Sequence, residues 1–358
     1  MIKATADASE RFLLLLVLAI AAAGVAAPAP GRALAAGNGI DAALAVLVFA
    51  TGLSLRLADL VAVRLLWRRI VVVLLVSTAA LPALAWAASQ LIGDPVLRSG
   101  MQAAGVAPAE VATVALCVIA GGEAAVCATL LAASTIITVV AAGPILSVLG
   151  ASVTVSSAGL LGNLAVVIAL PLAAGVALRT AWSPGPQADA AIRLVTVLAL
   201  LLLLWQVASQ IRLNSAYVTV ILALVVYVAG SAALGGILAV RAPPAQATAI
   251  LLPVAMRDFA VAAGIATAAF GPAAAAPLGA YGVLVLLAGS LAAIIARRPP
   301  APHGMDLPAR SGTATPRFSR VTVHDPCGTG SGPPRRRRPL RPARPAPTAR
   351  DPARPAGR

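Results

Sequence analysis

Ten long apolar stretches, separated by short polar segments, occupy residues 12–296 of this 358-residue chain. A helix needs about 17–25 largely apolar residues to cross the hydrocarbon core of a membrane, and each stretch has about that length. The stretches cover residues 12–28, 39–57, 70–92, 97–120, 124–148, 157–178, 191–211, 216–239, 246–270 and 275–296. We therefore predict an all-α polytopic membrane protein with about ten transmembrane helices.

The composition excludes a soluble domain, because 60% of the residues are hydrophobic and only 11% are charged. Soluble domains contain about 45–50% apolar residues. The sequence also gives no sign of an enzyme: His303 and His324 lie in a polar C-terminal segment, and neither a glycine-rich phosphate loop nor metal-ligand spacing is present. We expect no catalytic residue, no metal, no cofactor and no nucleic-acid partner. The sequence predicts no oligomeric state.

The Lys and Arg residues between the stretches predict the orientation, since cytoplasmic loops carry an excess of them. With the N-terminus inside, nine fall on the inner side and three on the outer side. The inner set is Lys3, Arg11, Arg56, Arg64, Arg68, Arg69, Arg179, Arg193 and Arg241, and the outer set is Arg32, Arg98 and Arg212. We expect a multi-pass protein of the cell inner (plasma) membrane with both termini in the cytoplasm.

The first stretch has a second interpretation as a signal peptide, because it is short and is followed by small residues. Asp7 and Glu10 make a poor positively charged region before it. This pattern favours a retained transmembrane helix.

The loop at residues 179–190, which contains Pro184-Gly185-Pro186, divides the stretches into two sets of five. We predict two five-helix repeats, residues 1–178 and 179–296. Five spans in each repeat is an odd number, so the two repeats would be inverted relative to each other. Residues 57–69 mix apolar and charged groups, which predicts an amphipathic cytoplasmic connector at the membrane surface.

Residues 297–358 differ from the rest in composition. They contain 14 Arg, no Lys and 3 Asp, a net charge of +11 out of +15 for the chain. Such a Pro- and Arg-rich segment cannot bury enough apolar surface to fold, so we predict a disordered cytoplasmic tail. Its run of four arginines, residues 335–338, could attract anionic membrane lipid. A solvated tail without specific partners is the alternative.

The fourth stretch of each set is interrupted in the same way. Pro108 is followed by Glu110 in the first set, and Pro253 is followed by Arg257 and Asp258 in the second. Proline removes a backbone donor and kinks or breaks a helix. A charged residue at the membrane centre costs about 2.5–3.5 kcal/mol and usually marks a site. We predict that these two helices, the fourth and the ninth, are discontinuous and cross each other.

Broken helices leave backbone groups that only protein or a wet cavity can satisfy. The N-terminal ends of the half-helices suit an anion, and their C-terminal ends suit a cation. The predicted substrate- or ion-binding residues are Pro108, Glu110, Thr113, Pro253, Met256, Arg257 and Asp258. A buried Arg257–Asp258 pair that only holds helices together is the alternative interpretation.

Three motifs, in this order, resemble the bile acid:sodium symporter superfamily, whose relatives include arsenite and auxin-efflux-type carriers. Residues 49–55 (Phe-Ala-Thr-Gly-Leu-Ser-Leu) are similar to a glycine-leucine-serine-leucine signature. Pro108 precedes Gly122-Glu123, and Met-Arg-Asp-Phe-Ala at residues 256–260 precedes Phe-Gly-Pro at residues 270–272. The resemblance covers residues 12–296. It implies two inverted five-helix repeats, a panel and a core domain, and alternating access at the crossing helices.

The sodium sites that this resemblance implies have changed. In sodium-coupled relatives, side-chain oxygens on the fourth, fifth and ninth helices hold the cation. An ungapped alignment places at those positions Thr113, Val114, Cys127, Leu131 and Pro253. Only the threonine keeps an oxygen ligand, whereas a hard cation needs several.

Two further exchanges suggest what replaces sodium. Arg257 and Asp258 stand where the second sodium site has a glutamine and the asparagine that follows it. We hypothesise that the Arg257 guanidinium supplies the positive charge that bound sodium supplies elsewhere. Glu110 would then be its counter-charge, with Asp258 as the other candidate.

Together these patterns predict a secondary active transporter of a small organic anion, coupled to protons or uncoupled. The planar guanidinium of Arg257 suits a carboxylate, and Glu110 could carry a proton. Three alternatives remain: a sodium-coupled symporter of a bile-acid-like anion, an arsenite-type efflux carrier, and a non-transporting membrane sensor or scaffold. Arsenite could meet the thiols of Cys117 and Cys127, although buried cysteines more often only pack.

Overall fold

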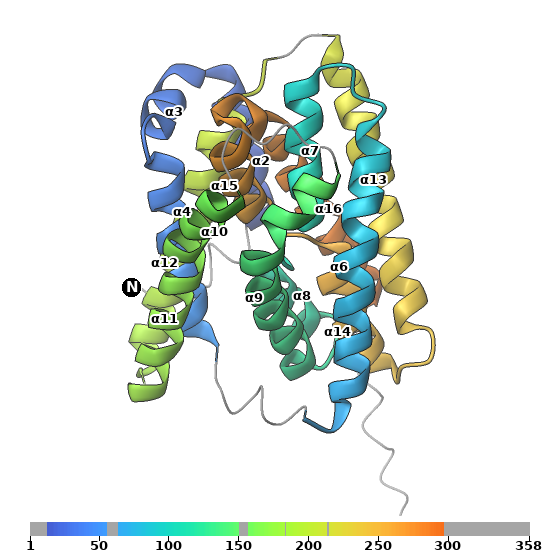
Figure 1. Cartoon of the computed structure of the whole chain (residues 1–358). Helices are drawn as coiled ribbons and strands as arrows, with labels where there is room; N and C mark the ends of the chain where they lie inside the picture. Colours follow the sequence, from blue (N-terminus) through green and yellow to red (C-terminus); the bar gives the residue numbers. More distant parts are fainter. Residues whose placement is uncertain (1–12, 56–63, 150–156, 183, 213–214, 297–358) are drawn as a thin grey trace, which may run out of the picture. The chain divides into compact units, whose positions relative to one another are not determined.

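The computed structural model describes residues 13–55, 64–149, 157–182, 184–212 and 215–296, and these form helices joined by short loops (Figure 1). In the first half the helices are α2 (Leu13–Ala26), α3 (Pro28–Ala35), α4 (Gly39–Ser54), α6 (Trp67–Ser89), α7 (Pro95–Val106), α8 (Ala112–Ile119), α9 (Ala124–Val148), α10 (Ser157–Leu164) and α11 (Leu170–Ala181). In the second half they are α12 (Pro186–Ala208), α13 (Ala216–Ala239), α14 (Pro244–Ala255), α15 (Phe259–Phe270) and α16 (Ala276–Ala296). Within these ranges there is no strand.

Six of the described helices are long and apolar enough to cross a membrane on their own. They are Trp67–Ser89, Ala124–Val148, Ala158–Ala181, Pro186–Ala208, Tyr217–Ala239 and Pro272–Ala296. A seventh is counted if α2 and α3, which meet at an angle of 94°, make one span. The prediction of an all-helical polytopic membrane protein is therefore confirmed, while ten crossing helices remain a prediction.

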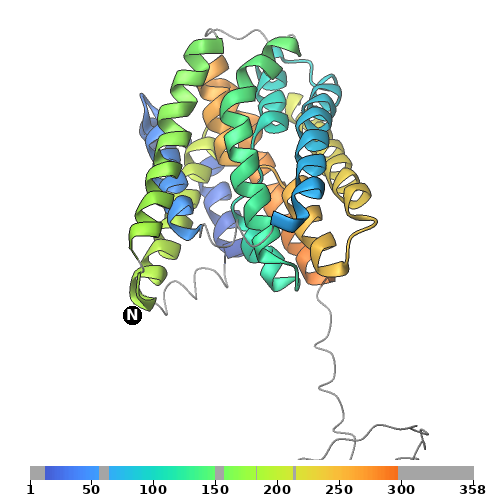
Figure 2. The same ribbon diagram turned by 60° about the horizontal axis from the view of Figure 1, so that its bottom comes forward.

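The helices pack in two groups, and each group draws on both halves of the sequence (Figures 1 and 2). We call α2, α3, α4, α11 and α12 the first bundle, and α6, α7, α8, α9, α13, α14, α15 and α16 the second bundle. In the first bundle, α4 and α11 approach closely at two glycines: a Cβ atom on Gly175 would lie 2.4 Å from the backbone oxygen of Phe49, and one on Gly52 would lie 2.6 Å from that of Leu172. Small residues allow this close approach of helices in a membrane.

Prolines affect the helices differently. Pro82 and Pro144 lie inside α6 and α9, which continue through them. Pro171 follows a π-helical turn, Ala165–Ala169, which joins α10 to α11. Such a turn is one way in which a helix absorbs the missing donor and the steric clash of proline.

Arg64–Leu66 form a 3-10 turn and Trp67 begins α6, so the predicted connector at residues 57–69 overlaps the start of this helix, and its position at the membrane surface stays a prediction. The apolar residues after Arg69 continue α6 without a break as far as Ser89. The remainder of the connector, residues 57–63, and the predicted tail at residues 297–358 lie outside the described residues.

Candidate functional site

Both predicted interruptions are present as breaks in the helices. α7 ends at Val106 and α8 begins at Ala112, while α14 ends at Ala255 and α15 begins at Phe259. Pro108 lies inside the first break, as expected. Pro253 does not lie inside the second: it belongs to the last turn of α14. The helix continues past this proline and ends two residues later, at Ala255, before Asp258 caps the next helix.

The two breaks are joined to each other by their backbones. Ala109 and Arg257 form an antiparallel β-bridge. The amide of Glu110 donates to the carbonyl oxygen of Met256 at 2.9 Å, and the amide of Asp258 donates to that of Pro108 at 2.8 Å. Two segments about 150 residues apart in the sequence therefore satisfy each other's hydrogen bonds in the interior of the second bundle.

Side chains on neighbouring helices satisfy further backbone groups of the breaks. The amide of Ala109 donates to the Ser134 hydroxyl at 3.1 Å, and the amide of Arg257 donates to the Tyr281 hydroxyl at 3.1 Å. Hydroxyl groups also donate to carbonyl oxygens at the ends of α7 and α14: Thr138 to Val106, Tyr227 to Ala104 and Ser231 to Ala255. Sequence reasoning missed all five side chains, although isolated polar residues in apolar stretches were the available signal.

The two buried carboxylates lie at the N-terminal ends of the half-helices. Asp258 caps α15, and its Oδ1 accepts hydrogen bonds from the amides of Ala260 and Val261, both at 2.9 Å. Glu110 Oε2 accepts from the amide of Phe259 at 3.4 Å, and the same carboxylate also meets the first amides of α8. The side chains of Glu110 and Asp258 are 1% and 2% exposed. These carboxylates already complement the positive ends of the helices, where an external anion was expected.

Arg257 points elsewhere. It is 5% exposed and lines a pocket with residues of α6, α7 and α9, next to the C-terminal end of α7. Its Nε is buried without a hydrogen-bond partner among the described residues. The partial negative charge at the end of α7 favours a cation there, but it does not replace a counter-ion in a dry interior.

Arg257 forms no salt bridge with Glu110 or Asp258 among the described residues, so the hypothesised counter-charge stays a prediction. In the part of the chain that the structure describes, the salt bridge is between Arg179 and Asp189, at 2.6 Å. Both buried carboxylates accept hydrogen bonds from amides at the start of α15. No salt bridge joins Arg257 and Asp258 among the described residues either, so the alternative of a structural pair has no such contact to support it.

The other predicted site residues have different contacts. Thr113 donates to the carbonyl oxygen of Glu110 at 2.5 Å, so its hydroxyl is used inside the break. Met256 is buried, and its sulfur packs so close to Gly289 that a Cβ atom there would lie 2.2 Å away. Cys117 and Cys127 are buried free thiols that lie next to each other. The described residues contain no group of three or more His, Cys, Asp and Glu that could hold a metal ion.

Both resumed helices end at a glycine. Gly121, just after α8, has φ 72°, and Gly271, just after α15, has φ 90°. Residues with a Cβ atom rarely adopt this region, so glycine allows both helices to stop sharply.

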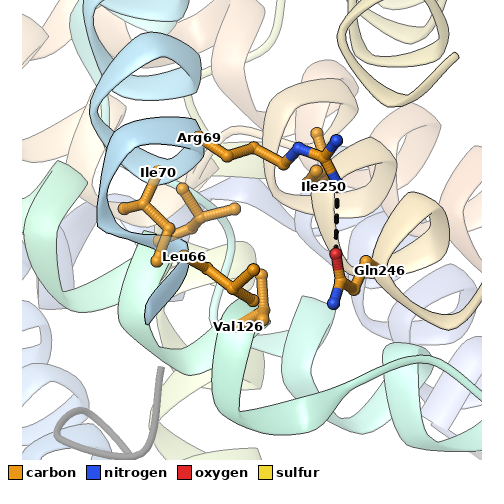
Figure 3. A pocket seen from close by; sticks show the side chains of 7 residues that line it. Leu66, Arg69, Ile70, Val126, Gln246 and Ile250 are labelled. Carbon is orange, nitrogen blue, oxygen red and sulfur yellow. Dashed lines mark hydrogen bonds between the residues drawn. The ribbon is translucent and has the colours of Figure 1, made fainter. Parts of the chain in front are cut away.

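A second pocket lies where α6, α9 and α14 begin (Figure 3). Arg69 reaches across from α6, and its guanidinium donates to the Gln246 side chain at 3.1 Å and to the carbonyl oxygen of Arg241 at 3.1 Å. The rest of the lining is apolar. Because this arginine has partners on α14 and in the loop between α13 and α14, the pocket is a structural contact between helices, unlike the pocket at Arg257.

Apolar helices of spanning length around a buried, charged double break are typical of a multi-pass membrane protein. Within that class, the chain belongs to the SBF-like CPA transporter family, whose family model matches residues 10–289. This family is related to the bile acid:sodium symporters, so the resemblance seen in the sequence is confirmed at that level. A comparison with curated proteins finds no match.

Proposed function

We propose that this chain is a secondary active transporter that moves a small organic anion across the membrane by alternating access, with Arg257 as the anion-binding group. One observation carries the proposal: a guanidinium sits at the junction of two broken helices, 95% buried, without a salt bridge to any described residue. A buried charge needs compensation. A negatively charged substrate would provide it, and the planar fork suits a carboxylate.

We propose that transport is coupled to protons or is uncoupled, in preference to being coupled to sodium. Thr113 is the one oxygen-bearing side chain at the sodium-site positions that the family resemblance implies, whereas a hard cation needs several oxygen ligands. Glu110 and Asp258 are two buried carboxylates that serve the start of the same helix, α15, and they are the candidate proton carriers. Sodium-coupled symport of a bile-acid-like anion is the alternative. Uptake that depends strongly on a sodium gradient would favour that alternative.

We further propose that the ten predicted stretches cross the membrane as two inverted repeats, residues 1–178 and 179–296, with crossing helices α7–α8 and α14–α15. The antiparallel bridge between Ala109 and Arg257 supports this, because an axis in the membrane plane would bring equivalent breaks together in opposite directions. Single cysteines at Gly93 and Ala242, in a chain without its native cysteines, test the orientation. An impermeant maleimide applied outside the cell should label the first and spare the second.

The function is tested by comparing the solutes accumulated by cells that express the chain with those of cells that express Arg257→Gln. We expect one or more organic anions to differ between wild type and the empty host, and the difference to fall at least tenfold in the variant. Arg68→Gln is the matched control, since Arg68 is exposed and stacks on Trp67. A solute difference that survives Arg257→Gln would remove the assigned role of this arginine. No difference for any solute would favour the sensor or scaffold.

A further inference from the structure

The pocket that Arg257 lines is too small for an organic molecule in this conformation of the chain. Its free volume is about 10 Å³, which is about the room that one water molecule needs. We call it the Arg257 pocket, and its lining from α6 and α9 includes Thr78, Ser134 and Thr138. A carboxylate and the carbon chain that carries it do not fit this space, whereas a single atom does.

The guanidinium of Arg257 is the polar group of this pocket that is left in need of a partner. It has no salt bridge to a described residue, and its Nε is buried without a hydrogen bond. Ser134 and Thr138 already donate their hydroxyl protons to backbone oxygens. Thr78 lines the same pocket from α6 and carries a hydroxyl that can also donate. The pocket therefore offers hydrogen-bond donors and a positive charge to whatever occupies it.

The nearby buried carboxylates do not satisfy the guanidinium by contact. Glu110 and Asp258 accept hydrogen bonds from amides at the start of α15, and neither makes a salt bridge with Arg257 among the described residues. The amides and the positive N-terminal end of α15 compensate these carboxylates. A charge that is taken out of water without a counter-ion in contact is costly. A water molecule would only solvate the guanidinium, while a monatomic anion would also neutralise it.

We propose that the Arg257 pocket is a chloride site in this conformation, with the ion held by the guanidinium of Arg257 and the hydroxyl of Thr78. Chloride is the abundant monatomic anion of biological fluids, and it is only slightly larger than a water molecule. This inference rests on the proposed function for the choice of Arg257 as the anion-binding group, and it adds regulation of that site. Chloride occupies the arginine while the pocket is small, and the organic anion displaces it when the pocket widens.

Thermal unfolding of the purified full-length chain in detergent tests the site, with sodium gluconate replaced stepwise by sodium chloride at constant ionic strength. A ligand that binds only the folded chain raises its melting temperature. We expect a saturable rise with chloride for the wild type, and no rise when sodium acetate replaces the gluconate. Arg257→Gln should lose the chloride-dependent rise, and Thr78→Val should need at least threefold more chloride for half of it. Arg68→Gln, at an exposed position of α6, is the matched control and should respond as the wild type does.

The outcomes separate this inference from the proposed function. An equal chloride response in the wild type and in folded Arg257→Gln, or a rise with acetate as large as with chloride, overturns the chloride site. If Arg257→Gln does not fold, equilibrium dialysis of the wild type against radioactive chloride decides: one bound ion per chain is expected, and none would contradict the site.

The same variant gives different results for the two proposals. If solute accumulation depends on Arg257 while chloride leaves the melting temperature unchanged, the transporter stands and the chloride site fails. If chloride acts through Arg257 but solute accumulation is indifferent to this residue, the chloride site stands and the proposed function fails.

Discussion

At the second break, three consecutive side chains point in three directions. Met256 packs on α16 at Gly289, Arg257 lines the pocket formed with α6, α7 and α9, and Asp258 caps α15. The extended backbone produces this divergence, since successive side chains alternate in direction when the chain is not helical. The charges are thereby sorted by helix polarity, with a cation near the C-terminal end of α7 and anions at the N-terminal end of α15.

Asp258 is expected to stabilise the fold through its cap, whatever further role it has. Asp258→Ala leaves the amides of Ala260 and Val261 without a partner and should cost about 0.5–2 kcal/mol, seen as a lower melting temperature in detergent. Asp258→Asn keeps an oxygen acceptor and should lose much less. An equal loss in both variants would show that the negative charge, and not the cap geometry, supports the structure.

The tyrosine hydroxyls beside the break should differ in their importance. Tyr281 accepts from the buried amide of Arg257, whereas Tyr227 donates to the carbonyl oxygen of Ala104. An orphaned buried amide is tolerated less often than an under-satisfied carbonyl. We therefore expect Tyr281→Phe to cost about 1–3 kcal/mol and to lower the melting temperature more than Tyr227→Phe. The centroids of the two rings lie 5.8 Å apart, so the same substitution is compared at two positions with similar surroundings. The reverse order would contradict this account.

At the scale of elements, the sequence predicted the helices well and the contacts between them poorly. Apolar length placed α9, α12 and α13 close to their observed bounds, and proline with charge marked both breaks. Pro253 misled because it belongs to the last turn of α14, and the helix ends only after it. The partners of the breaks, such as Ser134 and Tyr281, come from distant helices. No local pattern of one sequence encodes which helices meet.

The packing of α4 on α11 should depend on glycine. Gly175→Ala would place a Cβ atom 2.4 Å from the backbone oxygen of Phe49, which cannot move without shifting the helix. We expect a loss of about 1–3 kcal/mol, measured as a lower melting temperature. Gly236→Ala on α13 is the matched control, because no atom lies within 4 Å of its added Cβ. That substitution should be neutral or slightly stabilising, since alanine favours helix. Equal effects of the two substitutions would refute the contact.

At the scale of the whole molecule, the two bundles do not correspond to two consecutive parts of the sequence. The loop at residues 179–190 separates the predicted repeats, yet α12 from beyond this loop packs with α2 and α4 from before it. Both breaks lie in the second bundle. Alternating access, as proposed, therefore requires the second bundle to move against the first and to carry the Arg257 pocket with it.

Contacts between the bundles and contacts inside one of them should respond differently to cross-linking. A Cβ atom on Gly264 of α15 would lie 2.5 Å from Leu44 Cδ2 of α4, across the two bundles. A Cβ atom on Gly230 of α13 would lie 2.7 Å from Leu84 Cδ2 of α6, inside the second bundle. The chain thus offers two leucine–glycine pairs of nearly equal geometry. A disulfide in the pair across the two bundles would resist the proposed motion. A disulfide in the pair inside the second bundle would move together with that bundle.

In the double variant Leu44→Cys with Gly264→Cys, we expect solute uptake to fall at least tenfold after oxidation and to recover when a reductant is added. The control, Leu84→Cys with Gly230→Cys, should cross-link to a similar extent and keep its uptake. Both are made in a chain in which Cys117, Cys127 and Cys327 are replaced. The yield of cross-linking is measured by cleaving the chain between the two cysteines and running a non-reducing gel, on which a disulfide keeps the two fragments together. Full uptake by the cross-linked first variant would mean that the bundles do not move against each other along this contact. Alternating access would then have to rely on motion within the second bundle.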